Sequence, residues 1–239
     1  SSDNLALLSH IDIDLSECSN FETQEACMMG GCMWMNMNET CMADNVPHDV
    51  AIDNDDGYWF TSTIMAGYIG MYSLQDNGLI SSYHIGDQPA LLAVDEAENK
   101  LYVSRMMPMS MGDDGMDMGS TTNIIHELSY ASGVLEASNE FNLQFSAPHA
   151  IAFDNVYGNI YTASNTNDFL AKINPSDGSW TYLTLDAAYN ADNNPTISVN
   201  RLKPLQISLH PSYLFVSCTA GYWQATDGTE EFIPGQVQM

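Results

Sequence analysis

The most distinctive chemical groups of this chain are thioethers, because twelve of its 15 methionines fall in two short segments. The first segment spans residues 28–42. The second, full of Gly, Asp and Ser, has neither strand nor helix periodicity and cannot bury six side chains as a core would. Thioethers are soft, neutral ligands that favour Cu(I), so this second segment predicts a copper site; the alternatives are a plastic contact surface or no role. Its methionines are Met106, Met107, Met109, Met111, Met116 and Met118.

Two histidines recur at one position of a repeated motif. His48 and His149 each follow a proline in the segments Pro47–Asp53 and Pro148–Asp154, which share Pro-His, a central Ala and a final Asp. Neutral imidazole is a common metal ligand, so the pair predicts copper ligands near the mouth of a channel, completed by further groups. The alternative is that each ring is a hydrogen-bonded structural residue. Ordinary strand or terminal roles are expected for His10, His84, His126 and His210.

Four of the five cysteines lie near the N-terminus with the spacing C-x8-C-x4-C-x8-C. A compact, even-numbered cluster is typical of a small extracellular module held by disulfides, and the pairing stays open. Zinc is the alternative ligand, although the segment has no CxxC pair and no His between its cysteines. We predict two disulfides within a module spanning residues 1–45, formed by Cys18, Cys27, Cys32 and Cys41. Cys218 is expected to be a buried thiol or to pair with a cysteine after Met239.

Composition limits the partners and the chemistry. The 239 residues include 5 Lys plus Arg against 31 Asp plus Glu, for a formal net charge of −26, so nucleic acid and anionic membrane are excluded. A hydrophobic fraction of 45% excludes acidic disorder. No apolar run approaches the ~18 residues of a membrane helix, so no transmembrane segment is expected. The common hydrolase, zinc-protease and nucleotide-binding motifs are absent, and no catalytic residue is predicted.

An internal repeat predicts the elements that must position these residues. Four segments align without gaps, each opening with Pro and closing six residues later with Asp or, in the fourth, His: Pro47–Asp53, Pro89–Asp95, Pro148–Asp154 and Pro204–His210. Short strands rich in aromatic and β-branched residues follow, separated by turns with Asn-Gly or Asp-Gly. The first two repeats start 42 residues apart. Four-stranded units at this spacing are β-propeller blades, so the fold class is all-β.

We expect a propeller domain over residues 46–239, with blades at 47–86, 88–146, 147–185 and 204–239, the last incomplete. Because propellers close their rings, either further blades follow Met239 or the segment Leu5–Leu15 completes the fourth blade. The acidic segment Asp53–Gly57 is expected to be a strand connection rather than a calcium loop. One repeat position is expected to be buried between blades, at Ile52, Val94, Phe153 and Leu209.

Several of these motifs resemble known families. The opening Pro-x-x-[Val/Leu/Ile]-Ala-[Ile/Val/Phe]-Asp with its aromatic second strand resembles YVTN-type secreted propellers, related to lactonase-like and NHL-like repeats. The stretch from Cys18 to Trp34 resembles the cysteine-rich PSI-type modules of secreted and cell-surface proteins. The segment Arg105–Gly119 resembles Met-rich segments of periplasmic copper-handling proteins. Nitrous-oxide reductase and selenium-binding-type propellers also place copper-binding histidines near the starts of inner strands, as at His48 and His149.

The sequence thus predicts a secreted or cell-surface β-propeller that binds copper through Met-rich loops without catalysis, the periplasm being the alternative location. A second hypothesis is a structural or adhesive extracellular protein that assembles with copies of itself into surface layers or filaments. A third is a copper-dependent propeller enzyme with His48 and His149 at its site. The expected partners are a metal ion or a protein at the surface.

Overall fold

The computed structural model of the chain describes Ile11, Ile13 and residues 22–29, 33–35, 40–42, 46–64, 66–86, 88–105, 123–186, 201–225 and 228–239. For residues 28–29, 33–35 and 40–42 this description covers the backbone alone. The second Met-rich segment, the side chains of the first and most of the segment Leu5–Leu15 therefore lie outside the described residues.

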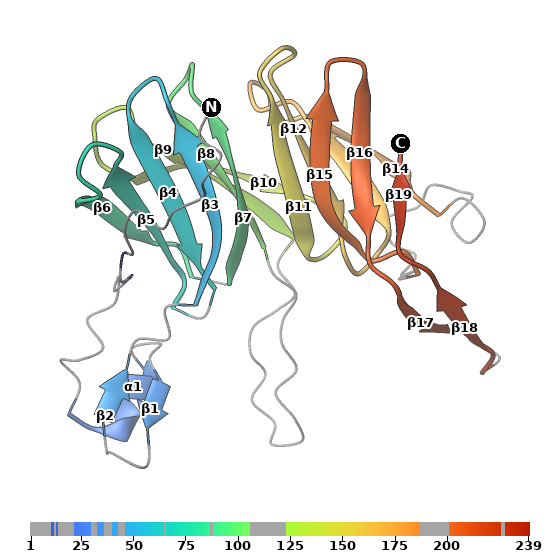
Figure 1. Cartoon of the computed structure of the whole chain (residues 1–239), viewed down its shortest axis with the longest axis horizontal. Coiled ribbons are helices and arrows are strands. Elements are labelled where there is room, and N and C mark those ends of the chain that lie inside the picture. The colour runs from blue at the N-terminus through green and yellow to red at the C-terminus, as the bar shows by residue number, and fades with distance from the viewer. Residues whose placement is uncertain are drawn as a thin grey trace, which may run out of the picture.

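Three four-stranded antiparallel sheets follow one another along the chain, as the repeat predicts (Figure 1). Each sheet is one blade, with its strands paired in chain order. Blade 1 contains β3 (Pro47–Asp53), β4 (Tyr58–Thr63), β5 (Tyr68–Ser73) and β6 (Leu79–His84). Blade 2 contains β7 (Pro89–Asp95), β8 (Lys100–Arg105), β9 (Ile124–Ser129) and β10 (Glu136–Asn142). Blade 3 contains β11 (Pro148–Asp154), β12 (Asn159–Ser164), β13 (Phe169–Ile173) and β14 (Trp180–Thr184).

Blade 4 is three-stranded and carries an inserted ribbon. Its strands are β15 (Pro204–His210), β16 (Tyr213–Cys218) and β19 (Gln236–Gln238), which pairs with β16. Between β16 and β19 the chain forms the hairpin β17 (Gly221–Gln224) and β18 (Glu230–Ile233). Tyr222 and Phe232 are opposite each other in this hairpin and their ring centres lie 5.3 Å apart, which is a stabilising cross-strand aromatic pair.

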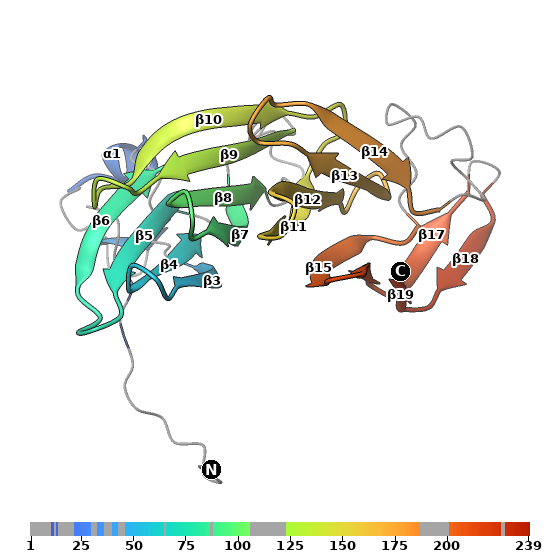
Figure 2. The ribbon, with the colours of Figure 1, turned by 90° about the horizontal axis from the view of Figure 1, so that it is seen from above.

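The blades lie side by side around an open arc, seen from above in Figure 2. The first strand of each blade, β3, β7, β11 and β15, lies on the concave side of the arc, and β6, β10 and β14 lie on its outer side. Neighbouring inner strands contact one another, β3 with β7, β7 with β11 and β11 with β15. Residues at the same repeat position are thereby brought to the same level of the concave surface.

The residue that closes each repeat motif has a structural role in the turn that follows. The Oδ1 atom of Asp53 accepts hydrogen bonds from the backbone N–H groups of Asp55 and Asp56. Asp95 and Asp154 accept the corresponding pairs of bonds in blades 2 and 3. In blade 4 the ring atom Nδ1 of His210 accepts the bond from Ser212 N. Asp and His are interchangeable here because both offer an acceptor to a turn, and Asp53–Gly57 is a strand connection, as predicted.

Hydrophobic cores fill the spaces between adjacent blades. Blades 2 and 3 enclose a cluster that includes Ile125, Phe141, Ile151 and Phe169. The repeat position shared by Ile52, Val94, Phe153 and Leu209 is equivalent in every blade, since each pairs with the second strand in the same register.

The expectation that all four residues at this position are buried is wrong. Val94 and Phe153 pack partly buried against interblade clusters, but Ile52 is 49% exposed and Leu209 is 38% exposed. Val94 and Phe153 each pack on the cluster shared with the preceding blade, and in the described part of the chain no preceding blade covers Ile52. Leu209 does have blade 3 before it, but lies outside the cluster between blades 3 and 4. This position is therefore partly buried in blades 2 and 3 and exposed in blades 1 and 4.

The N-terminal module contains the helix α1 (Gln24–Met29) and the paired strands β1 (Met33–Met35) and β2 (Thr40–Met42). Cys27 is fully buried and disulfide-bonded, and the side chains of Cys18, Cys32 and Cys41 lie outside the described residues. The two-disulfide arrangement stays a prediction. Cys218 is a buried free thiol, in line with the first of its two predicted roles, and burial raises its pKa to about 11.

Candidate functional site

The two histidines singled out by the repeat lie together in the folded chain. The ring centres of His48 and His149 are 5.7 Å apart, with the ring planes at 75°. The rings come from blade 1 and blade 3, although blade 2 lies between these blades in the arc. The equivalent residue of blade 2 is Ala90, which is buried and small, so it puts no bulky side chain at this level. Sequence position alone placed both histidines at inner-strand starts, and the arc brings them together.

The two rings have different surroundings. His149 is 2% exposed, and its Nδ1 atom lies 3.0 Å from the backbone carbonyl oxygen of Leu205. A carbonyl only accepts, so Nδ1–H donates this bond and Nε2 is left with the lone pair of the neutral ring. Burial lowers the pKa of His149, the bond to Leu205 raises it, and proximity to His48 lowers it further. His48 itself is exposed to solvent.

Leu205 occupies in blade 4 the repeat position that the histidines occupy in blades 1 and 3. Its backbone carbonyl is used, so no side-chain pattern in the sequence could have pointed to this contact. The carbonyl of Ala90, at the same position in blade 2, accepts a 2.5 Å hydrogen bond from the hydroxyl of Ser62. Each of these carbonyls thus joins one blade to the preceding one.

The carboxylate of Asp49, next to His48, also joins two blades. Its Oδ2 atom accepts a hydrogen bond from Leu92 N in blade 2, at 2.8 Å. Burial raises the pKa of Asp49, and the bonds from backbone N–H groups oppose this effect. Within the described parts of the chain, no group of three or more His, Cys, Asp or Glu side chains is placed to hold a metal ion.

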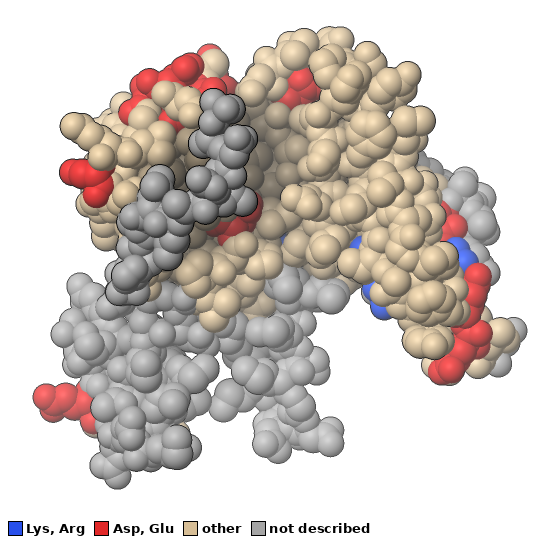
Figure 3. Space-filling view, viewed as in Figure 1, with Lys and Arg blue, Asp and Glu red and all other residues tan. Residues whose placement is uncertain are grey.

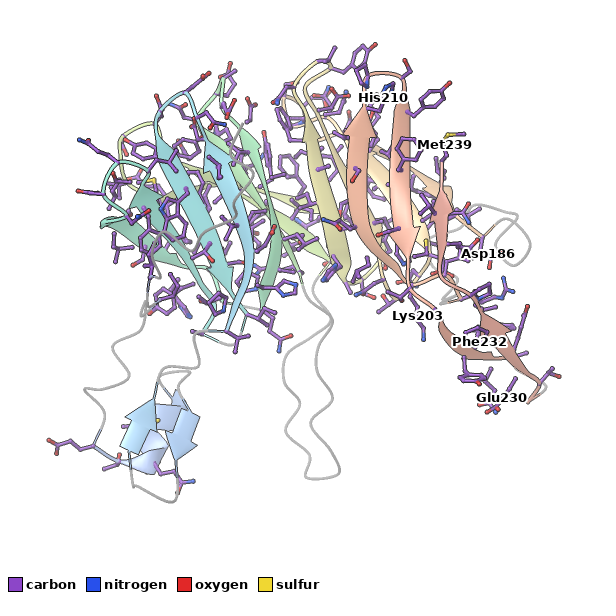
Figure 4. The ribbon with its side chains drawn as sticks, viewed as in Figure 1. Asp186, Lys203, His210, Glu230, Phe232 and Met239 are labelled. Carbon is purple, nitrogen blue, oxygen red and sulfur yellow. The ribbon has the colours of Figure 1, made fainter. Side chains whose placement is uncertain are left out.

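The same end of the propeller is where the two Met-rich segments join the blades. Arg105, the last residue of β8, pairs with Pro89 at the start of β7, and Met106 follows it directly. The starts of the inner strands share this end: in Figure 4, Lys203 lies just before β15 at the lower end of blade 4 and His210 lies at the upper end. Figure 1 places α1, β1 and β2 below the blades on this side. We call this end the lower rim. The methionines at 106–118 lie outside the described residues.

A buried cluster that the sequence did not reveal lies at the end of β8. Arg105 is fully buried, donates from Nη1 to the carbonyl oxygen of Gly86 at 2.8 Å, and contacts Nε2 of His126 through Nη2. The other ring nitrogen of His126 is 3.3 Å from a carboxylate oxygen of Glu140. Burial and the charge of Arg105 lower the pKa of His126 to about 3. His126 lies within β9, in line with the expected strand position, and its neutral imidazole contacts a buried guanidinium.

At the end of the blades opposite the lower rim, a cavity of about 360 Å³ lies between strand-connecting turns. Two of its acidic groups already have structural roles, since Asp95 accepts bonds from its own turn and Glu96 accepts bonds from Asn54. Figure 3 shows acidic atoms gathered at the top of the left-hand blades, against a mainly uncharged described surface. The cavity lining is completed by Asp55, Ala97, Glu98, Phe153, Asn155 and Gly158.

Comparison with solved structures supports the propeller. The chain is similar to hydrazine synthase from Kuenenia stuttgartiensis, with 11% identity and a TM-score of 0.56 over 81% of this chain and 47% of that one. It is similar to a streptogramin B lyase, with 16% identity and a TM-score of 0.55 over 81% of this chain and 56% of that one. The WD40 repeats of RRP9 are similar with 10% identity and a TM-score of 0.52, over 81% of this chain and 52% of that one.

At these identities the likeness shows the fold, a β-propeller, and nothing about activity. The chain spans about half the length of these solved structures. No protein-family model matches the sequence, and no curated protein matches it. In the described part of the chain, no helix has the length and apolar character needed to cross a membrane.

Proposed function

We propose that this protein is a secreted or cell-surface β-propeller that binds copper through its Met-rich segments without catalysing a reaction. The observation that carries the proposal is the position of Arg105. Because this residue pairs with Pro89 at the start of an inner strand, the six methionines that follow it begin at the lower rim, where His48 and His149 lie.

The first Met-rich segment is tethered to the same rim. The strand β2 ends at Met42 and β3 begins at Pro47, so four residues connect them. A chain of this length spans at most about 17 Å. Two groups of soft ligands are thus attached to one end of the propeller. A methionine that is open to solvent is prone to oxidation to the sulfoxide, so the use of methionine in Gly- and Asp-rich sequence favours a role for sulfur itself.

The proposed location rests on the cysteines. Disulfides persist in oxidising compartments such as the cell exterior and the periplasm. The disulfide-bonded Cys27 supports such a compartment, and we propose that all four N-terminal cysteines pair in a PSI-like module. The YVTN-type motif and the propeller fold support a secreted relative of lactonase-like and NHL-like repeats, as does the streptogramin B lyase among the similar structures.

A structural or adhesive role is the second candidate, and the inserted ribbon favours it. Tyr222 and Phe232 are 72% and 56% exposed on β17 and β18, which project from blade 4 (Figure 4). Exposed aromatic side chains on a projecting hairpin are typical of contact with another protein chain. A copper enzyme, with His48 and His149 among its ligands, is the third candidate; two of the similar structures are named as enzymes, a synthase and a lyase.

Titration with Cu(I) tests the copper proposal. In the test variant Met106, Met107, Met109 and Met111 are changed to Leu, which keeps the bulk and removes the sulfur. We expect the affinity for Cu(I) to fall at least about tenfold. The matched control is Met239→Leu, which removes a thioether that is 80% exposed outside both clusters and should bind as the wild type does. Equal affinity in the wild type and the four-residue variant would refute the proposal and favour the contact-surface role.

A further inference from the structure

We infer that His48 and His149 together form a separate binding site for a divalent metal ion that prefers nitrogen ligands. If the ion is copper, it is Cu(II). The inference goes beyond the proposed thioether function, because it uses different residues, a different ligand atom and a different class of ion. Imidazole nitrogen suits Cu(II) and Zn(II), whereas thioethers select Cu(I).

The separation of the two rings fits one shared ion. A metal ion lies about 2 Å from a coordinating imidazole nitrogen, and therefore about 3 Å from the centre of the ring. Two rings on one ion then have centres at most about 6 Å apart. The centres of His48 and His149 are 5.7 Å apart, just inside this limit. The angle of 75° between the planes is no obstacle, since each ring can turn about its own metal–nitrogen bond.

The hydrogen bond of His149 prepares its other nitrogen for an ion. Metal-binding histidines almost always donate their second ring N–H to a carboxylate, carbonyl or water, which fixes the tautomer. The carbonyl of Leu205 provides this partner for Nδ1 at 3.0 Å. Leu205 belongs to a different blade from either histidine, so the orientation of the ring depends on blade 4 being seated on blade 3.

The lone pair of Nε2 is available to an ion, because the hydrogen bond to Leu205 uses the other ring nitrogen of His149. In the described part of the chain no residue donates a hydrogen bond to Nε2. A metal ion satisfies this lone pair, and the exposed His48 gives an ion access from solvent. The two rings leave coordination positions for water, and the net charge of −26 raises the local concentration of cations.

The test is Cu(II) titration followed by electron paramagnetic resonance, with excess Ca²⁺ present to occupy surface carboxylates. The wild type should show hyperfine coupling to two imidazole nitrogens. His48→Ala changes an exposed ring and should leave the fold intact, so it should lose one nitrogen coupling and bind at least about tenfold more weakly. His149→Gln should show the same loss. The matched control is His210→Gln, because this exposed ring lies at the opposite end of blade 4 (Figure 4).

Two results would overturn the inference. One is that His48→Ala keeps the affinity and both nitrogen couplings of the wild type. The other is that His210→Gln weakens binding as much as His48→Ala, which would mean adventitious binding by surface imidazoles. The Cu(I) affinity of His48→Ala, measured in parallel, should equal that of the wild type. A failure of the histidine site and a failure of the methionine site are thereby told apart.

Discussion

The carboxylate of Asp168 holds the segment that leads into blade 4, and replacing it tests how the blade is seated. Asp168 is fully buried in blade 3. Its Oδ2 atom accepts hydrogen bonds from Arg201 N at 2.6 Å and Leu202 N at 2.9 Å, and Oδ1 accepts one from Lys203 N at 3.0 Å. The strand β15 begins at the next residue. One side chain therefore fixes the start of the strand whose carbonyl orients His149.

The change Asp168→Asn should destabilise the protein by about 3 kcal/mol. An amide has one acceptor atom, so at most two of the three N–H groups keep a partner. The amide NH₂ must then face the remaining N–H donor in a buried site. Hydrogen bonds to a charged group contribute about 1.5–3 kcal/mol each, and the two retained bonds lose their charge assistance as well. Burial raises the pKa of Asp168, so the comparison is made near pH 8, where a carboxyl is ionised.

The matched control is Asp154→Asn. There a single oxygen, Oδ1, accepts both turn bonds, from Val156 N and Tyr157 N, so an amide oxygen can keep both. Asn is also favoured in such turns, and the cost should stay below about 1 kcal/mol.

Urea unfolding followed by tryptophan fluorescence measures both changes. Trp223 reports on this region, because its ring centre lies 5.1 Å from the Arg201 guanidinium. Hydrogen exchange should accelerate at the amides of residues 201–203 in Asp168→Asn alone. If the two variants differ by less than about 1 kcal/mol and these amides keep their protection, the second carboxylate oxygen of Asp168 does not stabilise the protein as predicted.

Three further predictions concern other described groups. His126 has a folded pKa of about 3, below its ordinary value, so the free energy of unfolding should fall as the pH drops below about 6.5, by up to about 1.4 kcal/mol per pH unit. This slope should be shallower in His126→Gln, and parallel profiles of the two proteins would contradict the prediction. Tyr130→Phe removes a buried 2.7 Å hydrogen bond to Asp53 that joins blades 2 and 1, and should lower the free energy of unfolding in urea by about 2 kcal/mol. The control Tyr102→Phe should be nearly neutral, because Tyr102 is also buried but its hydroxyl has no described partner. Mass spectrometry without reduction should find two intrachain disulfides among the four N-terminal cysteines, Cys18, Cys27, Cys32 and Cys41. Free thiols on all four would contradict this prediction.

The blades could be predicted from the sequence because their signals are local. Strand alternation, Gly-containing turns and the residue that closes each repeat act over fewer than ten neighbours along the chain. Asp53 accepts bonds from N–H groups two and three residues away, and His210 accepts one from Ser212, two residues away. A residue type that recurs at this position therefore indicates a turn that recurs in each blade. The same repeat placed His48 and His149 at equivalent positions.

What the sequence could not determine are properties that depend on a neighbouring blade. The distance between His48 and His149 depends on how three blades curve, and the partner of His149 is a backbone carbonyl, which every residue has. Ile52 and Val94 share one repeat position and differ in burial, because only Val94 has a preceding blade packed against it in the described part of the chain. Periodicity along a strand reports which face a side chain is on. Whether another sheet covers that face, and which groups it brings, is decided by tertiary packing.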